Sequence, residues 1–154
     1  MKNVGKIAKT AFVLYVVLML WLLFGQRIGN EALDGYSDKI MENVNLVPFY
    51  TLKDYISMLK SGETRRITYL AIINLVGNVI MFVPLGFLLP FIYKRAKSFA
   101  GCMVTSFIIL LCVEVTQLIT FLGSFDIDDL LLNMVGAFIG YIGYKMMKID
   151  KPSV

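Results

Sequence analysis

Residues 70–92 read LAIINLVGNVIMFVPLGFLLPFI, a run of apolar residues without a single charged side chain. A helix needs about 20 mostly apolar residues to cross the hydrocarbon of a bilayer. The stretch therefore predicts a transmembrane helix, and Pro84 within it favours a kink. Asn74 and Asn78 are unusual in such a helix, because polar groups inside a span usually face a partner or a cavity.

The composition of the whole chain agrees with a membrane location. Of its 154 residues, 58% are hydrophobic and only 17% are charged, whereas soluble domains are about 45–50% apolar and about 25% charged. The first apolar run follows three lysines but no small-x-small cleavage site, so we expect an uncleaved anchor. We expect an all-α polytopic membrane protein, a single domain over 1–154, with four transmembrane helices at about 10–25, 70–92, 99–122 and 127–147.

The distribution of Lys and Arg predicts the orientation of the spans. Basic residues gather at one set of span ends, whereas the short loop 123–126 has none. Cytoplasmic loops carry the excess of Lys and Arg in membrane proteins. Both termini are therefore expected in the cytoplasm, with loops 26–69 and 123–126 outside. The basic ends carry Lys2, Lys6, Lys9, Lys94, Arg95, Lys97, Lys145, Lys148 and Lys151.

Part of the long outer loop has a helical pattern. Residues 45–62 read NLVPFYTLKDYISMLKSG, and Leu52, Tyr55, Ile56 and Leu59 fall on one face of a helix. The pattern predicts a short interfacial helix in the first outer loop, which lies on the membrane surface or caps the bundle.

Polar residues recur at one depth in three of the spans. At about 1.5 Å per residue, the deeper set lies roughly 10–12 Å below the outer boundary and the shallower set one turn above it. Lipid cannot satisfy such groups, so we expect the three helices to turn them toward one another and form a polar pocket open to the outside. The deeper set is Asn78, Glu114 and Asn133, and the shallower set is Asn74, Gln117 and Asp129.

Two readings of these polar residues remain open. They could form a binding pocket, or they could simply hydrogen-bond one another and hold the helices together. An ionisable group such as Glu114 favours the pocket, because helix packing does not need a charge, and burial can raise the pKa of a Glu by several units. Gly136 and Gly140 are spaced to permit close helix contact beside the pocket.

The fourth span begins with a concentration of acidic residues, within GSFDIDDLLLNMVG at 123–136. Asp126 is a good helix N-cap, and Asp129 then falls at the third helical position, where it can reach back to the cap. Negative charge also suits the positive end of a helix dipole. This explanation covers Asp126 and Asp128 well, and covers Asp129 less well because Asp129 shares a face with Asn133. A divalent cation on Asp126 and Asp128 is a weaker alternative.

At this point the sequence resembles the VanZ-like membrane proteins of bacteria. The resemblance lies in NLVPF (45–49), NLVGNVIMFVPLGFLLP (74–90) and EVTQLITFLGSFDIDDLLLNMVGAFIGY (114–141), in the order of the family. The polar, proline and glycine positions that resemble those of the family are Asn45, Pro48, Asn74, Asn78, Pro84, Gly86, Glu114, Gln117, Asp126, Asp129, Asn133 and Gly136. Many relatives carry an Arg shortly before the Ser-Phe-Asp segment, where this chain has only Gly123. If that Arg binds an anionic group in those relatives, Arg65 or Arg66 would have to take its place here, or this member binds its ligand differently.

The resemblance implies a plasma-membrane protein of the bacterial cell envelope that is associated with low-level resistance to glycopeptide antibiotics, teicoplanin above all. The first hypothesis is that the pocket binds a membrane lipid, a lipid-linked cell-wall precursor or a lipoglycopeptide. The two arginines would pair with phosphate, or their side chains would only extend to the membrane–water interface. The ligand-binding residues would be Asn74, Asn78, Glu114, Gln117, Asp126, Asp129, Asn133, Arg65 and Arg66.

Two other classes of function are kept as alternatives. A membrane-embedded enzyme could use Glu114 and Asp129 as acid and base on a lipid-linked substrate, although the chain has no His and no recognisable hydrolase motif. A proton- or ion-coupled transporter could use Glu114. We expect no cofactor, no metal and no nucleic-acid partner, and the sequence leaves the oligomeric state open.

Overall fold

The computed structural model describes residues 2–25, 43–60 and 65–149. Within these ranges the spans predicted from the sequence are confirmed as four helices long and apolar enough to cross a bilayer, at Gly5–Gly25, Ala71–Ile92, Phe99–Ile119 and Ile127–Met147. The elements are α1 (Lys2–Leu20), η1 (Trp21–Gly25), β1 (Val44–Asn45), α3 (Tyr50–Lys60), α4 (Arg65–Ile92), η2 (Lys94–Lys97), α5 (Phe99–Ile119), β2 (Phe125–Asp126) and α6 (Ile127–Ile149).

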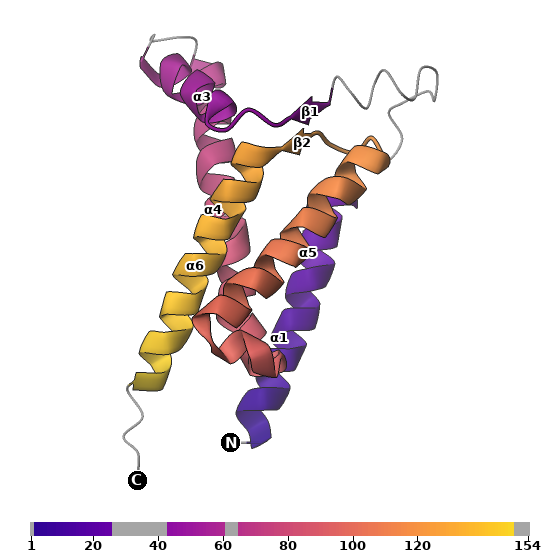
Figure 1. Cartoon of the computed structure of the whole chain (residues 1–154), viewed down its shortest axis with the longest axis vertical. Helices are drawn as coiled ribbons and strands as arrows, with labels where there is room; N and C mark the ends of the chain where they lie inside the picture. Colours follow the sequence, from indigo (N-terminus) through magenta and orange to yellow (C-terminus); the bar gives the residue numbers. More distant parts are fainter. Residues whose placement is uncertain (1, 26–42, 61–64, 150–154) are drawn as a thin grey trace.

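The long helices form one bundle, with α3 and the two short strands at one end (Figure 1). The short helix expected within residues 45–62 of the first outer loop is present as α3, which begins at Tyr50. Val44 and Asn45 instead pair in parallel with Phe125 and Asp126. Phe49 then adopts a φ of 64°, a left-handed conformation that no right-handed helix can include.

The third span is also shorter than expected, because α5 ends at Ile119 rather than at Leu122. Phe121 has a φ of 54°, and the Leu122 N–H donates to the Gln117 carbonyl oxygen at 3.0 Å. This is the left-handed closure with which many helices end. It turns the chain away from the axis of α5, and β2 then leads across to the start of α6 (Figure 1).

The tightest helix contact joins α4 to α6. A Cβ added at Gly136 would collide with the Val79 carbonyl, and one added at Gly140 would collide with the Val83 carbonyl. From the first contact to the second, the residue number rises in both helices, so α4 and α6 run parallel. Gly86 contributes from α4, where an added Cβ would meet the backbone of Ala137. The close approach predicted from the spacing of Gly136 and Gly140 is confirmed.

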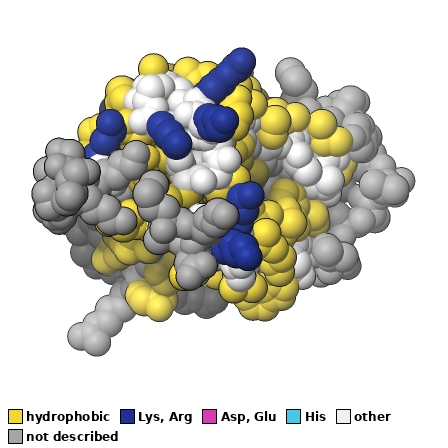
Figure 2. Space-filling view, turned by 90° about the horizontal axis from the view of Figure 1, so that it is seen from below, with side chains coloured by type: hydrophobic (Ala, Val, Ile, Leu, Met, Phe, Trp, Pro, Cys, Tyr) yellow, Lys and Arg dark blue, Asp and Glu magenta, His cyan; other side chains and the backbone are white. Residues whose placement is uncertain are grey.

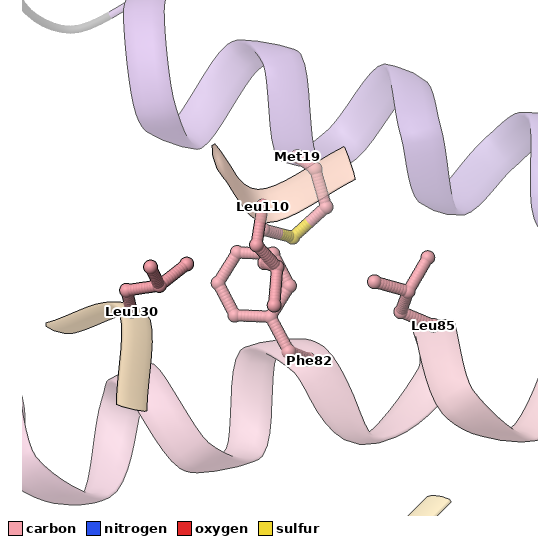
Figure 3. Close-up of a cluster of buried hydrophobic side chains, with 5 residues drawn as sticks. All are labelled: Met19, Phe82, Leu85, Leu110 and Leu130. Carbon is pink, nitrogen blue, oxygen red and sulfur yellow. The ribbon is translucent and has the colours of Figure 1, made fainter. Parts of the chain in front are cut away.

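An apolar cluster fills the middle of the bundle and joins all four long helices (Figure 3). Its members are Met19 of α1, Phe82 and Leu85 of α4, Leu110 of α5 and Leu130 of α6. Outside this cluster every span exposes large apolar side chains, as a lipid-facing surface requires. Along α4 and α5, the polar residues singled out above lie outward of this cluster, toward the end of the bundle that α3 covers.

Candidate functional site

Asp126 fastens the loop before α3 to the start of α6. One of its carboxylate oxygens accepts from the Asp128 N–H at 2.8 Å, the hydrogen bond of an N-cap. Its other oxygen accepts from the Thr51 hydroxyl and, at 3.3 Å, from the Asn45 side-chain amide. Because these donors come from residues about 75 and 81 positions away, the carboxylate joins two distant segments as well as capping a helix.

Asp128 is fully buried, with 0% of its surface exposed, and it holds the N-terminus of α3. One carboxylate oxygen accepts from the Phe49 N–H at 2.6 Å and the other from the Leu52 N–H at 3.1 Å. The sequence analysis interprets Asp128 as a charge at the start of its own helix or, as a weaker alternative, as a cation ligand, and not as a cap of another helix. A signal was present, however, because α3 starts after Phe49, whose side chain cannot cap it. Its first N–H groups therefore needed an acceptor from another part of the chain.

The two asparagines of α4 bind different neighbours. The Asn78 amide donates to Asp129 of α6 at 2.6 Å, so these two predicted site residues lie together. The Asn74 amide donates to the Tyr55 hydroxyl of α3 at 3.1 Å. Burial raises the pKa of Tyr55, and the nearby charge of Asp129 raises it further, so the phenol keeps its proton at neutral pH. Tyr55 and Thr51 were not among the ligand-binding residues predicted from the sequence.

These contacts form what we call the outer polar cluster, a group of polar side chains from β1, α3, α4, β2 and the start of α6. Its negative charges are shared among hydroxyl, amide and backbone donors, which stabilises carboxylates away from bulk water. The cluster consists of Asn45, Thr51, Tyr55, Asn74, Asn78, Asp126, Asp128 and Asp129.

The polar residues of α5 are buried inside the bundle. Glu114 is 4% exposed and Gln117 is 6% exposed, so neither side chain faces lipid. Glu114 lies one turn outward of Leu110, as Asn78 lies one turn outward of Phe82, and both apolar residues belong to the cluster in Figure 3. The Gln117 amide donates to the Leu23 carbonyl oxygen at 3.4 Å. Thus Gln117 binds the first span, whereas Asn78 and Asp129 bind each other.

Asn133 occupies the deepest polar position on α6. Its side chain is 3% exposed, and within the described residues its Oδ1 accepts no hydrogen bond. A buried amide oxygen without a donor costs about 1–3 kcal/mol. Asn133 lies one helical turn beyond Asp129 and therefore on the same face of α6. This arrangement leaves a buried hydrogen-bond acceptor one turn deeper along α6 than Asp129.

Two further expectations concern the arginines and a metal. Arg65 and Arg66 begin α4, but the placement of their side chains lies outside the described residues. Among the described ranges, no group of three or more His, Cys, Asp or Glu residues is arranged to hold a metal ion. The carboxylates of Asp126 and Asp128, considered above as possible cation ligands, accept hydrogen bonds from the segment that leads into α3.

Comparison with known proteins places this geometry in a family. The family model described as VanZ/LLP1 matches residues 12–148. The chain is also 30% identical over 141 residues to Protein VanZ of Enterococcus faecium, an alignment that covers 88% of this chain and 73% of that protein. No solved structure matches the chain significantly. The family match covers most of the first span, the other three spans, α3 and every residue of the outer polar cluster.

Proposed function

The chain belongs to the VanZ/LLP1 family, and from this premise we propose that it binds an amphipathic molecule of the bacterial cell envelope at the outer polar cluster. The ligand is a membrane lipid, a lipid-linked cell-wall precursor or a lipoglycopeptide. Binding at this site would underlie an association with low-level glycopeptide resistance, with teicoplanin as the expected antibiotic. The protein would act in the plasma membrane by sequestering or modulating that ligand.

The observation that carries this proposal is the buried Asn133 amide next to the Asn78–Asp129 pair. A membrane interior supplies no water to satisfy a stray acceptor, so polar groups at this depth usually face a partner or a cavity. Hydroxyl, amide or ammonium groups of a polar ligand are suitable donors. The amides of Asn74, Asn78 and Gln117 each have two N–H groups, one of which already donates within the protein, and arginines at the start of α4 suit a phosphate.

The orientation required by the proposal puts the outer polar cluster on the extracellular side. Figure 2, a view of the opposite end, has Lys and Arg side chains on its surface and no Asp or Glu among the coloured atoms. The described basic residues near this end are Lys6, Lys9, Lys94, Arg95, Lys97 and Lys145. An excess of Lys and Arg marks the cytoplasmic side, which supports placing the start of α1 and the end of α6 in the cytoplasm.

This orientation predicts a labelling pattern for two variants that each gain one cysteine. Ser124 lies between α5 and β2 and Lys97 ends η2, and both residues are exposed. A membrane-impermeant maleimide added to intact protoplasts is expected to modify Ser124→Cys and to leave Lys97→Cys unmodified until the membrane is permeabilised. The parent protein, with its native Cys102 and Cys112, gives the background. Labelling of Lys97→Cys alone in intact cells would reverse the proposed topology.

The binding proposal predicts a loss of co-purified lipid when the cluster is altered. Asp129→Ala removes the acceptor of the Asn78 amide, and a hydrogen bond to a charged group contributes about 1.5–3 kcal/mol. We expect the fraction of protein that carries a lipid in native mass spectrometry to fall about tenfold or more, and resistance to fall with it. The matched control is Asp54→Ala, an aspartate on the exposed face of α3, which should leave both measurements unchanged.

The same assay distinguishes binding from acid–base catalysis. Glu114→Gln keeps the size and the hydrogen-bonding capacity of the side chain while it removes the ionisable group. Under the binding proposal this variant retains most of its lipid and its resistance phenotype. Complete loss of resistance with normal lipid retention would instead assign chemistry to Glu114 and would contradict the proposal.

A further inference from the structure

An apolar groove runs along the inner side of the first span, at the depth of the membrane interior. Its wall is made by side chains of α1 and η1 on one side and of α4 and α5 on the other. Phe82 and Leu85, members of the apolar cluster in Figure 3, form its floor. The groove therefore has a fixed inner surface, while α1 is the least buried of the spans, with 11% of its window buried.

The groove presents no polar surface. Among the described residues that line it, Tyr15 alone carries a side-chain oxygen or nitrogen, and its hydroxyl donates to the Met81 carbonyl oxygen at 3.0 Å. The cavity volume is about 100 Å³, whereas a single water needs only about 10–15 Å³ of such space. Apolar cavities of this kind stay dry and accept hydrocarbon. The groove is therefore large enough for several methylene groups.

The outer end of the groove meets the polar residues of α5. Leu23 lines the groove, and its carbonyl oxygen accepts from the Gln117 amide at 3.4 Å. Val113 also lines the groove and directly precedes the buried Glu114. One turn of α5 therefore carries both apolar groove residues and buried polar residues. A molecule with a polar end and a hydrocarbon end would match this succession.

We propose that the groove between α1, α4 and α5 holds one alkyl chain of the amphipathic ligand. This inference rests on the proposed function, because it assumes that the polar end of the ligand lies at the outer polar cluster. Inside a bilayer the chain gains nothing from leaving water, so the groove acts through dispersion contacts with a surface of fixed shape. Its contribution is to favour a chain of a given length and to orient the head below α3.

A pair of adjacent valines in α1 tests the inference. Val16 lines the groove, whereas Val17 is 60% exposed on the outer face of the same helix. The probe is phosphatidylglycerol with a diazirine on one acyl chain, in nanodiscs of phosphatidylglycerol and phosphatidylethanolamine. On irradiation we expect labels in the groove-lining peptides of α1 and α5. Val16→Phe should lower that labelling about fivefold, a change that a modest loss of contact energy produces, and Val17→Phe should leave it unchanged.

A second pair, on α5, guards against a folding defect in α1. Val113→Phe fills the groove from the opposite side, and Val115→Phe, at a residue 39% exposed, is its control. Equal labelling of groove and outer surfaces, or labelling that both groove variants leave intact, overturns the inference. Cross-linking of two copies of the chain at the groove, without lipid, overturns it as well. If Asp129→Ala releases lipid and the groove variants do not, the proposed function stands and only the groove assignment fails.

Discussion

Replacing Gly140 by alanine is expected to separate α4 from α6 and to destabilise the whole bundle. A Cβ at this position would collide with the carbonyl group of Val83 and crowd the backbone of Phe87. Backbone atoms cannot move aside as a flexible side chain can, so the helices themselves must shift. Overpacking of this kind costs about 3 kcal/mol. Thermal unfolding of the purified protein in detergent, followed by circular dichroism, measures the loss as a lower Tm.

Gly77→Ala is the matched control for this prediction. Gly77 also lies within a span, but a Cβ added there has no atom within 4 Å, and alanine is the better helix former. The variant should match or slightly exceed the stability of the parent protein. An equal drop in Tm for both variants would mean that the loss of glycine itself, rather than the close contact of α4 and α6, determines the result.

The α4–α6 contact also sets the geometry of the polar residues. Gly136 packs against Val79, the residue next to Asn78, and Asn78 binds Asp129, which lies about two turns further out along α6 than Gly136. A shift between these helices would therefore pull the amide from the carboxylate. For this reason we expect Gly140→Ala to lower lipid retention as well as stability, although Gly140 is remote from the polar cluster.

The spans and the short outer helix could be predicted from the sequence because their causes are local. An uncharged run such as 70–92 is long enough to cross a bilayer whatever surrounds it. The face of Leu52 and Tyr55 likewise follows from helical periodicity alone. The predicted ends of the helices were less accurate. Left-handed φ values delay the start of α3 at Phe49 and end α5 before Phe121. A phenylalanine gives no sequence signal for this conformation.

The polar site could be predicted in part. Spacing within each helix placed Asn78 and Asp129 on inward faces, and the structure brings them within hydrogen-bond distance at 2.6 Å. The role of Asp128 could not be derived in this way, because its donors lie 79 and 76 residues earlier in the chain. Local rules assign a helix-start aspartate to its own helix. A carboxylate that caps a different helix depends on the tertiary fold.

Asp128→Ala is expected to detach the start of α3 from the bundle. The substitution leaves the N–H groups of Phe49 and Leu52 without their acceptors, each a hydrogen bond to a charged group that contributes about 1.5–3 kcal/mol. Removal of a fully buried carboxylate also relieves a desolvation cost, so the spans themselves should stay folded. Hydrogen exchange of the Phe49 and Leu52 amides should accelerate about 100-fold or more, with little change in exchange within α4.

Ser124→Ala, at an exposed residue just before β2, is the control and should exchange as the parent does. Asp128→Asn is more informative, because the amide keeps one acceptor oxygen and turns an NH₂ group toward the second N–H donor. Its exchange should therefore be faster than that of the parent protein. If Asp128→Asn behaves as the parent while Asp128→Ala does not, shape rather than charge holds α3. Unchanged exchange in both variants would mean that the Asp126 contacts with Thr51 and Asn45 suffice to keep α3 over the polar cluster.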